Sequence, residues 1–371
     1  MIQRIFHPIG QGAFYSERHE NFNIVYDCGR RHNSKTADTV ITNAFKKEEV
    51  IDILFISHFD SDHVNKISVL KNHTLIKKVI LPLLDDEQKN FLINLHRVLK
   101  KGINVLISDP KKFFGKETEI IYVKANETNT LSDDTNRKNI DELKNGDQIS
   151  SGTILYTLSF PSMKTWVFIP YNHKSSVRSC ILKQELVKKG FDVHKLKENA
   201  KYTLHEIVND IGRNGKKSFN AIYKSLPKDG SDTCINENSM IVYSGIEKEH
   251  IGNIKCIYGI HSFILERTHR VSCIYTGDAD LNVVNLKNIY SNYWEYIGTI
   301  QIPHHGATQN FNESVLDDKN YICPISAKQN NKHHPSSEVI GKIISQNSYP
   351  ILISEYPKSE FIEEIIILDQ I

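Results

Sequence analysis

Four side chains of the kinds that bind metal ions stand within six residues of one another. The segment 58–63 reads H-F-D-S-D-H and follows an apolar, β-branched run, Ile51–Ser57, which predicts a buried strand. Imidazole and carboxylate together suit zinc, manganese or iron. A solvated polar loop is the alternative, but four such residues directly after a buried strand favour a metal site. Two pairs could serve two adjacent ions: His58 with Asp60, and Asp62 with His63.

Two later segments repeat this arrangement of a short apolar strand followed by a metal-binding residue type. Ile274–Asp280 reads I-Y-T-G-D-A-D and places Asp278 just past its strand. Ile300–Gly306 reads I-Q-I-P-H-H-G and ends in His304 and His305. Strands that end at the same edge of a sheet can bring such residues to one centre. These two segments could therefore supply the ligands that the four residues of the 58–63 loop do not provide.

The H-F-D-S-D-H run resembles the H-x-[HD]-x-D-H signature of the metallo-β-lactamase fold, in the variant with Asp at its third position. The resemblance implies two divalent metal ions, zinc or manganese. In that fold an Asp after the late strand bridges the metals and a His after the next strand completes one of them. Asp278 and His304 match those positions, and Asp62 is expected to serve catalysis as well. The implied ligands are His58, Asp60, Asp62, His63, Asp278 and His304.

The order of motifs is similar to that of the nuclease-like domain of ComEC-type DNA-uptake proteins. The turn G-Q-G-A at 10–13 precedes a strand ending in Asp27-Cys28-Gly29, and the metal loop follows. This resemblance implies that Asp27 supports the loop by hydrogen bonding. At 235–244 the chain reads I-N-E-N-S-M-I-V-Y-S, where many relatives carry a metal-binding His. Asn238 and Ser239 are therefore expected, with His305, to support the ligands; a backbone role in a turn is the alternative for Asn238 and Ser239.

The C-terminal motifs S-A-K-Q-N at 326–330 and H-H-P at 333–335 complete this resemblance. Two metal ions would make hydroxide available near neutral pH, and no side-chain nucleophile would be needed. A phosphodiester would still require charge neutralisation, which Lys328 could supply, and protonation of the leaving oxygen, which His334 could supply. Lys328 and Asn330 are the expected substrate-binding residues. An ordinary polar loop is the alternative for this segment.

Composition sets wide bounds. The 371 residues are 39% hydrophobic and 24% charged, which is ordinary for a globular protein, and the net charge of +2 neither requires nor excludes nucleic acid. The six cysteines are scattered without a C-x-x-C pair, which argues against a zinc finger or a disulfide scaffold. We expect a cytoplasmic protein, because the first residues lack a signal-peptide core and no apolar run approaches a membrane span. No protein partner is indicated.

Alternating strand and helix patterns predict an α/β protein, and the resemblance implies a four-layered αββα metallo-β-lactamase fold, two packed mixed sheets flanked by helices. The expected halves are residues 1–161 and 235–371. Residues 162–234 match no family motif and form an expected helical insertion, with helices at Val177–Gly190 and Thr203–Ile211. Its lysines and arginines suggest either a solvated helix face or a clamp for a phosphate backbone.

Local patterns add expectations that tertiary structure can test. The amphipathic run Asp85–Lys101 predicts a helix, with His96 at its surface, and Ile103–Ser108 reads as a strand. Hairpins are expected around Gly146–Ser159 and around Ser262–Tyr275. The final apolar stretches, 351–354 and 361–368, are expected to finish the second sheet.

The ligand types, together with the resemblance to ComEC-type domains, favour a two-metal phosphodiesterase or nuclease that cleaves DNA or RNA with a metal-activated water. A second interpretation is a hydrolase of a small molecule, such as a cyclic nucleotide, phosphoester or lactone. A third is a binding protein that kept the fold without turnover. The complete set of ligand types argues against the third.

Overall fold

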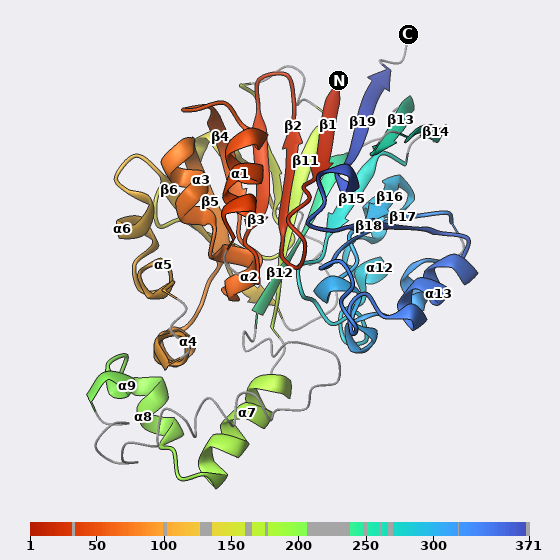
Figure 1. Cartoon of the computed structure of the whole chain (residues 1–371). Coiled ribbons are helices and arrows are strands. Elements are labelled where there is room, and N and C mark those ends of the chain that lie inside the picture. The colour runs from red at the N-terminus through yellow and green to blue at the C-terminus, as the bar shows by residue number, and fades with distance from the viewer. Residues whose placement is uncertain are drawn as a thin grey trace.

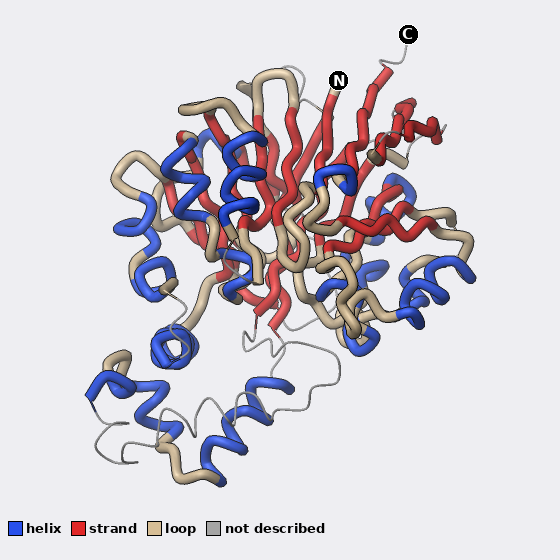
Figure 2. Tube along the Cα trace, viewed as in Figure 1, coloured by secondary structure: helices blue, strands red, loops and turns tan. Residues whose placement is uncertain are grey.

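Two β-sheets pack face to face, and helices cover their outer faces (Figure 1). The structure is a computed structural model of the whole chain. It describes all residues except 32–33, 99–101, 127–135, 160–164, 175–176, 206–237, 248–250, 260, 266–269, 318 and 369–371. Figure 2 shows the same arrangement by element type, with strands at the centre and helices around them.

The first sheet is 10-stranded and mixed. Its segment from β3 to β9 is parallel, and the strands on the other side of β3 are antiparallel to their neighbours. In spatial order it contains β14 (His261–Leu265), β13 (Ile251–Tyr258), β19 (Phe361–Leu368), β1 (Ile2–Phe6), β2 (Phe14–Arg18), β3 (Asn23–Cys28), β4 (Val50–Phe55), β5 (Leu75–Pro82), β6 (Glu119–Val123) and β9 (Gln148–Ile149).

The second sheet is 9-stranded and also mixed, with a parallel segment from β15 to β18. In spatial order it contains β18 (Tyr349–Ile353), β17 (Ile322–Ser326), β16 (Ile297–Ile300), β15 (Ser272–Tyr275), β12 (Asn238–Ile246), β11 (Trp166–Lys174), β10 (Ile154–Tyr156) and β8 (Arg137–Asn139), and β7 (Ala125–Asn126) pairs with β11.

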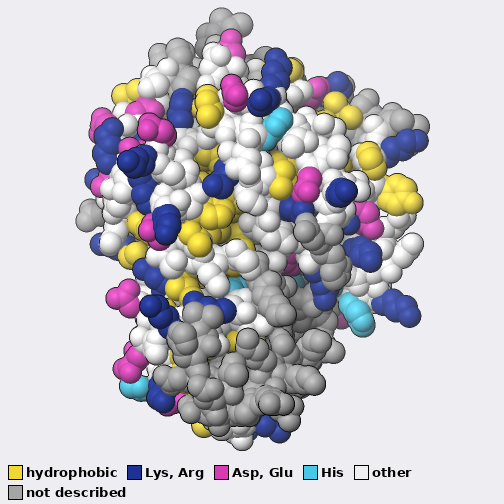
Figure 3. All heavy atoms as spheres, turned by 60° about the vertical axis from the view of Figure 1, so that its left-hand side comes forward, with side chains coloured by type: hydrophobic (Ala, Val, Ile, Leu, Met, Phe, Trp, Pro, Cys, Tyr) yellow, Lys and Arg dark blue, Asp and Glu magenta, His cyan; other side chains and the backbone are white. Residues whose placement is uncertain are grey.

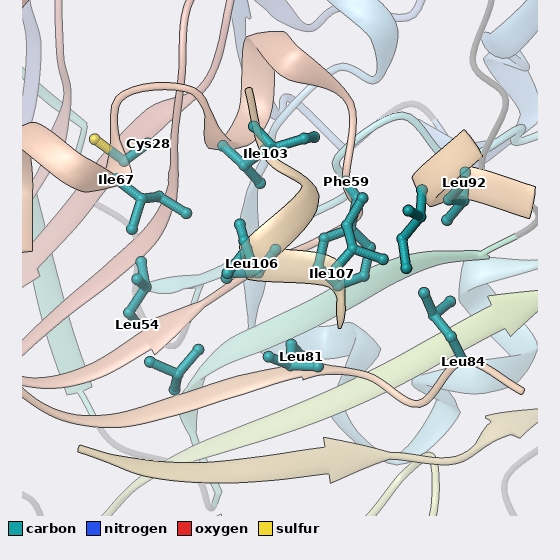
Figure 4. Packing of buried hydrophobic residues seen from close by; sticks show 14 of the residues in the cluster. Cys28, Leu54, Phe59, Ile67, Leu81, Leu84, Leu92, Ile103, Leu106 and Ile107 are labelled. Carbon is teal, nitrogen blue, oxygen red and sulfur yellow. The ribbon is translucent and has the colours of Figure 1, made fainter. Parts of the chain in front are cut away.

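The strands are apolar on both faces because each face is buried. On β4, Ile53 and Phe55 pack between the sheets, whereas Leu54 packs against the helices. On β12, Met240 lies between the sheets and Ile241 faces outward. Three cores therefore separate four layers, which confirms the predicted αββα arrangement of two packed mixed sheets flanked by helices. Figure 4 shows the outer core of the first sheet, where Leu54, Ile67, Leu81, Ile103 and Leu106 are among the packed residues.

Helices cover both outer faces. On the first sheet lie α1 (Lys35–Ala44), α3 (Ile67–His73), α4 (Asp86–Val98), α5 (Asn104–Ser108) and α6 (Pro110–Phe114), and on the second lie α12 (Leu286–Ile289), η3 (Ser291–Tyr296) and α13 (Ser337–Ser345). Short turns of helix complete the loops: α2 (Ser61–Val64), η1 (Ile140–Glu142), η4 (His304–Gly306), η5 (Thr308–Asn310), η6 (Glu313–Val315) and η7 (Pro357–Ser359). Among the described helices, none is long and apolar enough to cross a membrane.

A buried ionic cluster joins the two sheets. Arg4 of β1 donates to Glu17 at 2.7 Å and to Glu363 at 2.6 Å, and all three side chains are fully buried. Ser244 of the second sheet donates to Glu17 at 2.6 Å, and Tyr275 donates to it at 2.9 Å. Buried charges need such partners, so this cluster aligns the sheets as well as satisfying Arg4.

The helices of the expected insertion pack on α4. They are α7 (Val177–Lys188), α8 (Val193–Glu198) and α9 (Tyr202–His205), drawn in green below the sheets in Figure 1. The Asn94 side chain of α4 donates to the carbonyls of Leu196 at 2.9 Å and Asn199 at 2.7 Å, and its oxygen accepts from Thr203. The helix expected at Val177–Gly190 is thus confirmed, whereas most of the one expected at Thr203–Ile211 lies outside the described residues.

Several local expectations are wrong, and each error concerns long-range pairing or packing. Residues 104–108 form α5 rather than a strand, because Leu106 and Ile107 pack against the outer face of the first sheet instead of extending it. The strands expected as hairpins belong to different sheets: β9 pairs with β6 and β10 with β11, while β14 pairs with β13 and β15 with β12. The strand at 361–368 joins the first sheet, and His96 is buried.

One strand within the expected insertion is part of the second sheet. Strand β11, at 166–174, pairs with β12 over its whole length and forms part of the second sheet. The helices that depart from the sandwich start at α7. The division into 1–161, 162–234 and 235–371 remains a proposal, since its boundaries at 161/162 and 234/235 lie outside the described residues.

Candidate metal centre

The predicted ligands converge at one end of the sandwich. Asp27 ends β3, and the loop 58–63 follows β4 in the first sheet. Asp278 follows β15 and His304 follows β16 in the second sheet. The carboxyl ends of parallel strands are where ligands bind in open α/β sheets. Packing the two sheets face to face joins two such edges into one site.

Two overlapping groups of ligand atoms form this site. One contains His58, His63 and Asp278, and the other contains Asp62, His63 and His305; within each group the ligand atoms lie within 4.8 Å of one another. His63 Nε2 lies 3.1 Å from Asp278 Oδ1, and His58 Nε2 lies 3.5 Å from Asp278 Oδ2. One imidazole nitrogen binds one ion, so His63 would serve only one of two adjacent ions.

The two histidines of the 58–63 loop are each oriented by a hydrogen-bond partner at Nδ1. His63 Nδ1 lies 2.7 Å from Asp27 Oδ2, and His58 Nδ1 lies 2.8 Å from Ser57 Oγ. Ser57 also donates its backbone N–H and its hydroxyl to Asp27, at 2.7 and 2.6 Å. Such outer hydrogen bonds fix the tautomer and direct Nε2 inward, as at protein metal sites. The expected supporting role of Asp27 fits this geometry, and Ser57, directly before His58, is a participant that sequence reasoning missed.

The adjacent His304 and His305 lie on different sides of the site. His305 Nδ1 donates to the Ser326 carbonyl at 2.9 Å, and its Nε2 lies 3.3 Å from Asp62 Oδ2. His304 Nδ1 lies 3.7 Å from Asp278 Oδ2. Both residues have positive φ, 49° and 58°, which is uncommon outside glycine and typical of functional sites. The geometry therefore makes His305 a candidate ligand alongside His304.

Burial and neighbouring charges shift the pKa values of these side chains in different directions. Burial, with Asp62 and Asp278 nearby, raises the pKa of Asp60 to about 6. Burial opposes ionisation of Asp278, but the neighbouring His304, His63 and His58 outweigh it and hold its pKa well below the usual range. Burial likewise disfavours the charged form of His63, yet Asp278 and Asp27 raise its pKa overall.

The donor set fits divalent metal ions. The facing atoms His58 Nε2, His63 Nε2 and Asp278 Oδ1 are buried and make no ordinary hydrogen bond, although buried polar atoms are normally satisfied. Mixed imidazole and carboxylate donors are typical of zinc and manganese sites. The Asp60 and Asp62 side chains stay 13% and 16% exposed, so the centre opens to solvent on their side.

The other predicted site residues lie around this centre. Ser239 donates to the Thr276 carbonyl at 3.5 Å and packs beside Gly277, where an added Cβ would lie 3.1 Å from its hydroxyl. Asn238 begins β12, opposite Lys174. The His334 ring is buried, with its centroid 6.2 Å from that of His304.

Lys328 and Asn330 are exposed on the loop after β17, outside the buried cluster. Asn330 takes a left-handed conformation, with φ of 55°. The Lys328 carbonyl accepts from the Asn331 N–H at 3.2 Å, so the loop closes on itself near the rim of the centre. Their predicted role in substrate binding remains a proposal.

A cavity lies behind the metal loop, whose consecutive side chains point alternately to the metal centre and to this cavity. His58 and Asp60 point to the centre, whereas Phe59, between them, lines a cavity of about 200 Å³ with residues that include Leu84, Ile107 and Tyr122. Figure 3 shows apolar side chains at the middle of this side of the molecule, with lysines and arginines around them. The loop is therefore backed by apolar contacts that hold its position.

The fold class is assigned from the sheets and layers described above, and not from comparison with known proteins. No family model matches the chain, and no curated protein matches it. Among solved structures, the chain is similar to human tRNase Z, short form, with 8% identity over 95% of this chain and 92% of that one, and a TM-score of 0.39. It is also similar to the metallo-β-lactamase fold protein YhfI from Bacillus subtilis, with 9% identity over 98% and 99%, and a TM-score of 0.44.

Proposed function

We propose that this protein is a metal-dependent hydrolase, and specifically a two-metal phosphodiesterase that cleaves DNA or RNA. The observation that carries the proposal is the buried convergence of His58, His63 and Asp278 beside Asp62 and His305. The proposed metal ligands are His58, Asp60, Asp62, His63, Asp278 and His304, with His305 added by the geometry. A metal pair bound there would supply a hydroxide nucleophile and polarise a phosphoryl oxygen.

The chain's own residues would prepare the rest of the reaction. Asp27 and Ser57 hold the two imidazoles of the first sheet in position through the hydrogen bonds described above. Burial, and then the neighbouring His305 and His304, lowers the pKa of His334 to about 3, so this ring is neutral near pH 7 in the metal-free protein. We propose that the neutral His334 relays a proton from a solvent water to the leaving oxygen, accepting at one ring nitrogen as it donates from the other, and that Lys328 and Asn330 meet the phosphate at the open rim.

A phosphodiester substrate is favoured by the chemistry of the site and by the motif order. Metal ions and a lysine would neutralise the charge that develops on a phosphoryl group. The resemblance to ComEC-type domains supports nucleic acid as the substrate. Lys188 of α7 and Lys195 of α8 are exposed and could contact a phosphate backbone.

The test combines metal analysis with a cleavage panel. The purified protein is analysed for zinc and manganese, and then incubated with single- and double-stranded DNA and RNA and with small phosphodiesters and lactones. We expect about two ions per chain, and cleavage that is lost in the double variant Asp62→Ala, His63→Ala. Two ions with cleavage of small phosphodiesters alone would move the function to a small-molecule hydrolase, and binding without turnover would make it a binding protein. Absence of metal in the folded protein would refute the proposal.

A further inference from the structure

Three loops meet at the buried side chain of Gln11, beside the metal centre. The Gln11 carbonyl accepts from the backbone N–H of Arg31 at 2.9 Å. Its side-chain Oε1 accepts from Arg31 Nη1 at 3.3 Å and from Asn331 Nδ2 at 3.1 Å. Gln11 is only 4% exposed, so these bonds are shielded from water. Gln11 therefore orients the planar guanidinium of Arg31 relative to the C-terminal loop that carries Lys328 and His334.

The segment that carries Arg31 is locked to the metal loop by close backbone packing. A Cβ added to Gly29 would lie 2.4 Å from the Asp62 carbonyl, and one added to Gly12 would lie 2.3 Å from the Gly29 carbonyl. Ala13 N–H donates to the Asp62 carbonyl at 3.2 Å. Only glycine permits this approach. The turn before Arg31 and the loop bearing Asp62 therefore move as one rigid unit, as a substrate-positioning group requires.

A second anchor holds the neighbouring residue. The Arg30 N–H donates to Asn65 Oδ1 at 2.9 Å, and Asn65 Nδ2 donates back to the Arg30 carbonyl at 2.6 Å. Asn65 directly follows α2, the helix that contains Asp62 and His63. The main chain at 30–31 is thus fixed on both sides, by the 10–13 turn and by the end of the metal-binding helix.

The anchored segment brings Arg31 close to the loop that carries Asp62, since Arg31 follows Gly29 by two residues. Arg31 is half-buried, and its partner Gln11 also binds Asn331 of the C-terminal loop, whose His334 ring packs with His304 and His305 at centroid distances of 6.2 and 6.3 Å. The Asp60 and Asp62 side chains are partly exposed, so the centre is open to solvent there. A guanidinium presents a planar fork that matches two oxygens of a phosphate, and an anionic group bound between this fork and the metals would be neutralised from two directions.

We propose that Arg31, oriented by Gln11, is a substrate-binding residue that grips a phosphate of the substrate next to the metal centre. This inference rests on the proposed phosphodiesterase function, and it adds a residue that neither the motifs nor the metal ligands identify. Gln11 acts as a positioning residue, because it touches the guanidinium and not the substrate. Arg31 would contact either the scissile phosphate or a phosphate next to it in the substrate.

The experiment compares Arg31→Ala, Arg31→Lys and Gln11→Ala with wild type and with Lys255→Ala. Lys255 lies on β13 and pairs with Glu364, so its variant removes the same charge away from the site. The readouts are KM and kcat for a fluorescent oligonucleotide over a range of salt concentrations, bound metal, and thermal unfolding. Oligonucleotide binding is measured in parallel by anisotropy.

We expect Arg31→Ala to raise KM roughly 10-fold or more with bound metal unchanged, since bidentate charge-assisted contacts are among the stronger hydrogen bonds. The salt dependence of log KM should lose about one unit of slope, as for a lost phosphate contact. Arg31→Lys should restore the salt slope but only part of the affinity, because its ammonium is a point charge. Gln11→Ala should raise KM by a smaller factor without changing that slope. Lys255→Ala should behave as wild type.

Failure of the inference can be separated from failure of the proposed function. If wild type cleaves the oligonucleotide and Arg31→Ala matches it in KM and salt slope while Arg31→Lys also does so, the inference is overturned and the function stands. If wild type binds the oligonucleotide through Arg31 without cleaving it, the inference stands and turnover is refuted. If wild type neither binds nor cleaves any phosphodiester, both are refuted. Loss of metal or of folded structure in both Arg31 variants would assign Arg31 a structural role instead.

Discussion

Asp27→Asn isolates the support beneath the metal centre. The substitution keeps the shape of the side chain, and Asn tolerates the left-handed backbone of this position, where φ is 55°. The carboxylate accepts three bonds, two from Ser57 and one on the side of His63 Nδ1, at 2.6–2.7 Å. An amide replaces one acceptor oxygen with a donor, so at least one of these bonds becomes a donor facing a donor.

The expected magnitude follows from that lost bond. A hydrogen bond to a charged group contributes about 1.5–3 kcal/mol, which corresponds to a factor of roughly 10 to 150. Loss of an outer hydrogen-bond partner at metal sites typically lowers metal affinity about 10- to 100-fold. We therefore expect Asp27→Asn to bind its metal about 10- to 100-fold more weakly, with a matching fall in cleavage at limiting metal.

The assay is a competition titration of zinc between the protein and a chromophoric chelator. Asp52→Asn is the matched control, because Asp52 is also a buried aspartate beside β3, where it accepts from Asn23 and pairs with Lys77 away from the centre. The control should lose stability without losing metal affinity. Wild-type metal affinity in Asp27→Asn would refute the argument that this carboxylate directs His63 toward the metal.

Three further predictions follow from other contacts. Asp278→Asn should lower metal affinity by more than the roughly 100-fold expected for an outer partner, because it removes a ligand that faces three histidines. A chelator should therefore lower the Tm of wild type and of the Asp280→Asn control but not the Tm of Asp278→Asn. Equal metal content in all three proteins would contradict the assignment of Asp278 as a ligand. Asn94→Ala should speed proteolysis within 177–205 and cost about 1–3 kcal/mol, because it removes the side-chain donor to the buried Leu196 carbonyl of α8 and to the Asn199 carbonyl that follows this helix. An unchanged rate of proteolysis would show that α4 does not anchor these helices. Burial opposes ionisation of Glu17, but Arg4 and other partners lower its pKa to about 2 from an ordinary 4.5. The ionised Glu17 therefore contributes stability of the order of 3 kcal/mol, which is fully present above about pH 4.5 and is lost as the pH falls toward 2. In urea unfolding from pH 6 to pH 2, the free energy of unfolding should fall with pH in wild type and fall less in Glu17→Gln.

The metal loop could be predicted from sequence because its information is local. A strand of β-branched residues and the ligand types that follow it lie within thirteen consecutive residues, 51–63, and the strand itself directs them to one edge of the sheet. The four layers were implied by the resemblance to the metallo-β-lactamase fold, and strands apolar on both faces agree with them, since such strands require cover on both sides. The resemblance to a known order of motifs added Asp278 and His304 to this loop.

Strand pairing could not be predicted in the same way. The segments at 148–149 and 154–156 are close in sequence and separated by a turn, which is the usual signature of a hairpin. They join different sheets because the chain crosses from one layer to the other between them. Residues 104–108 are apolar enough for a strand, and they are helical because they pack on the face of the sheet, away from its edges.

The sequence by itself therefore determined the ligand residue types of the candidate metal centre and the apolar strands that carry them, since both depend on residue chemistry and short-range periodicity. Only the tertiary structure decided that His305 faces Asp62, because a left-handed turn and the Ser326 carbonyl set the direction of that ring. It also decided that Gln11 holds Arg31 beside the centre, because glycines bring three distant loops into backbone contact. Such contacts depend on where the chain returns after many residues, and residue type alone does not encode that return.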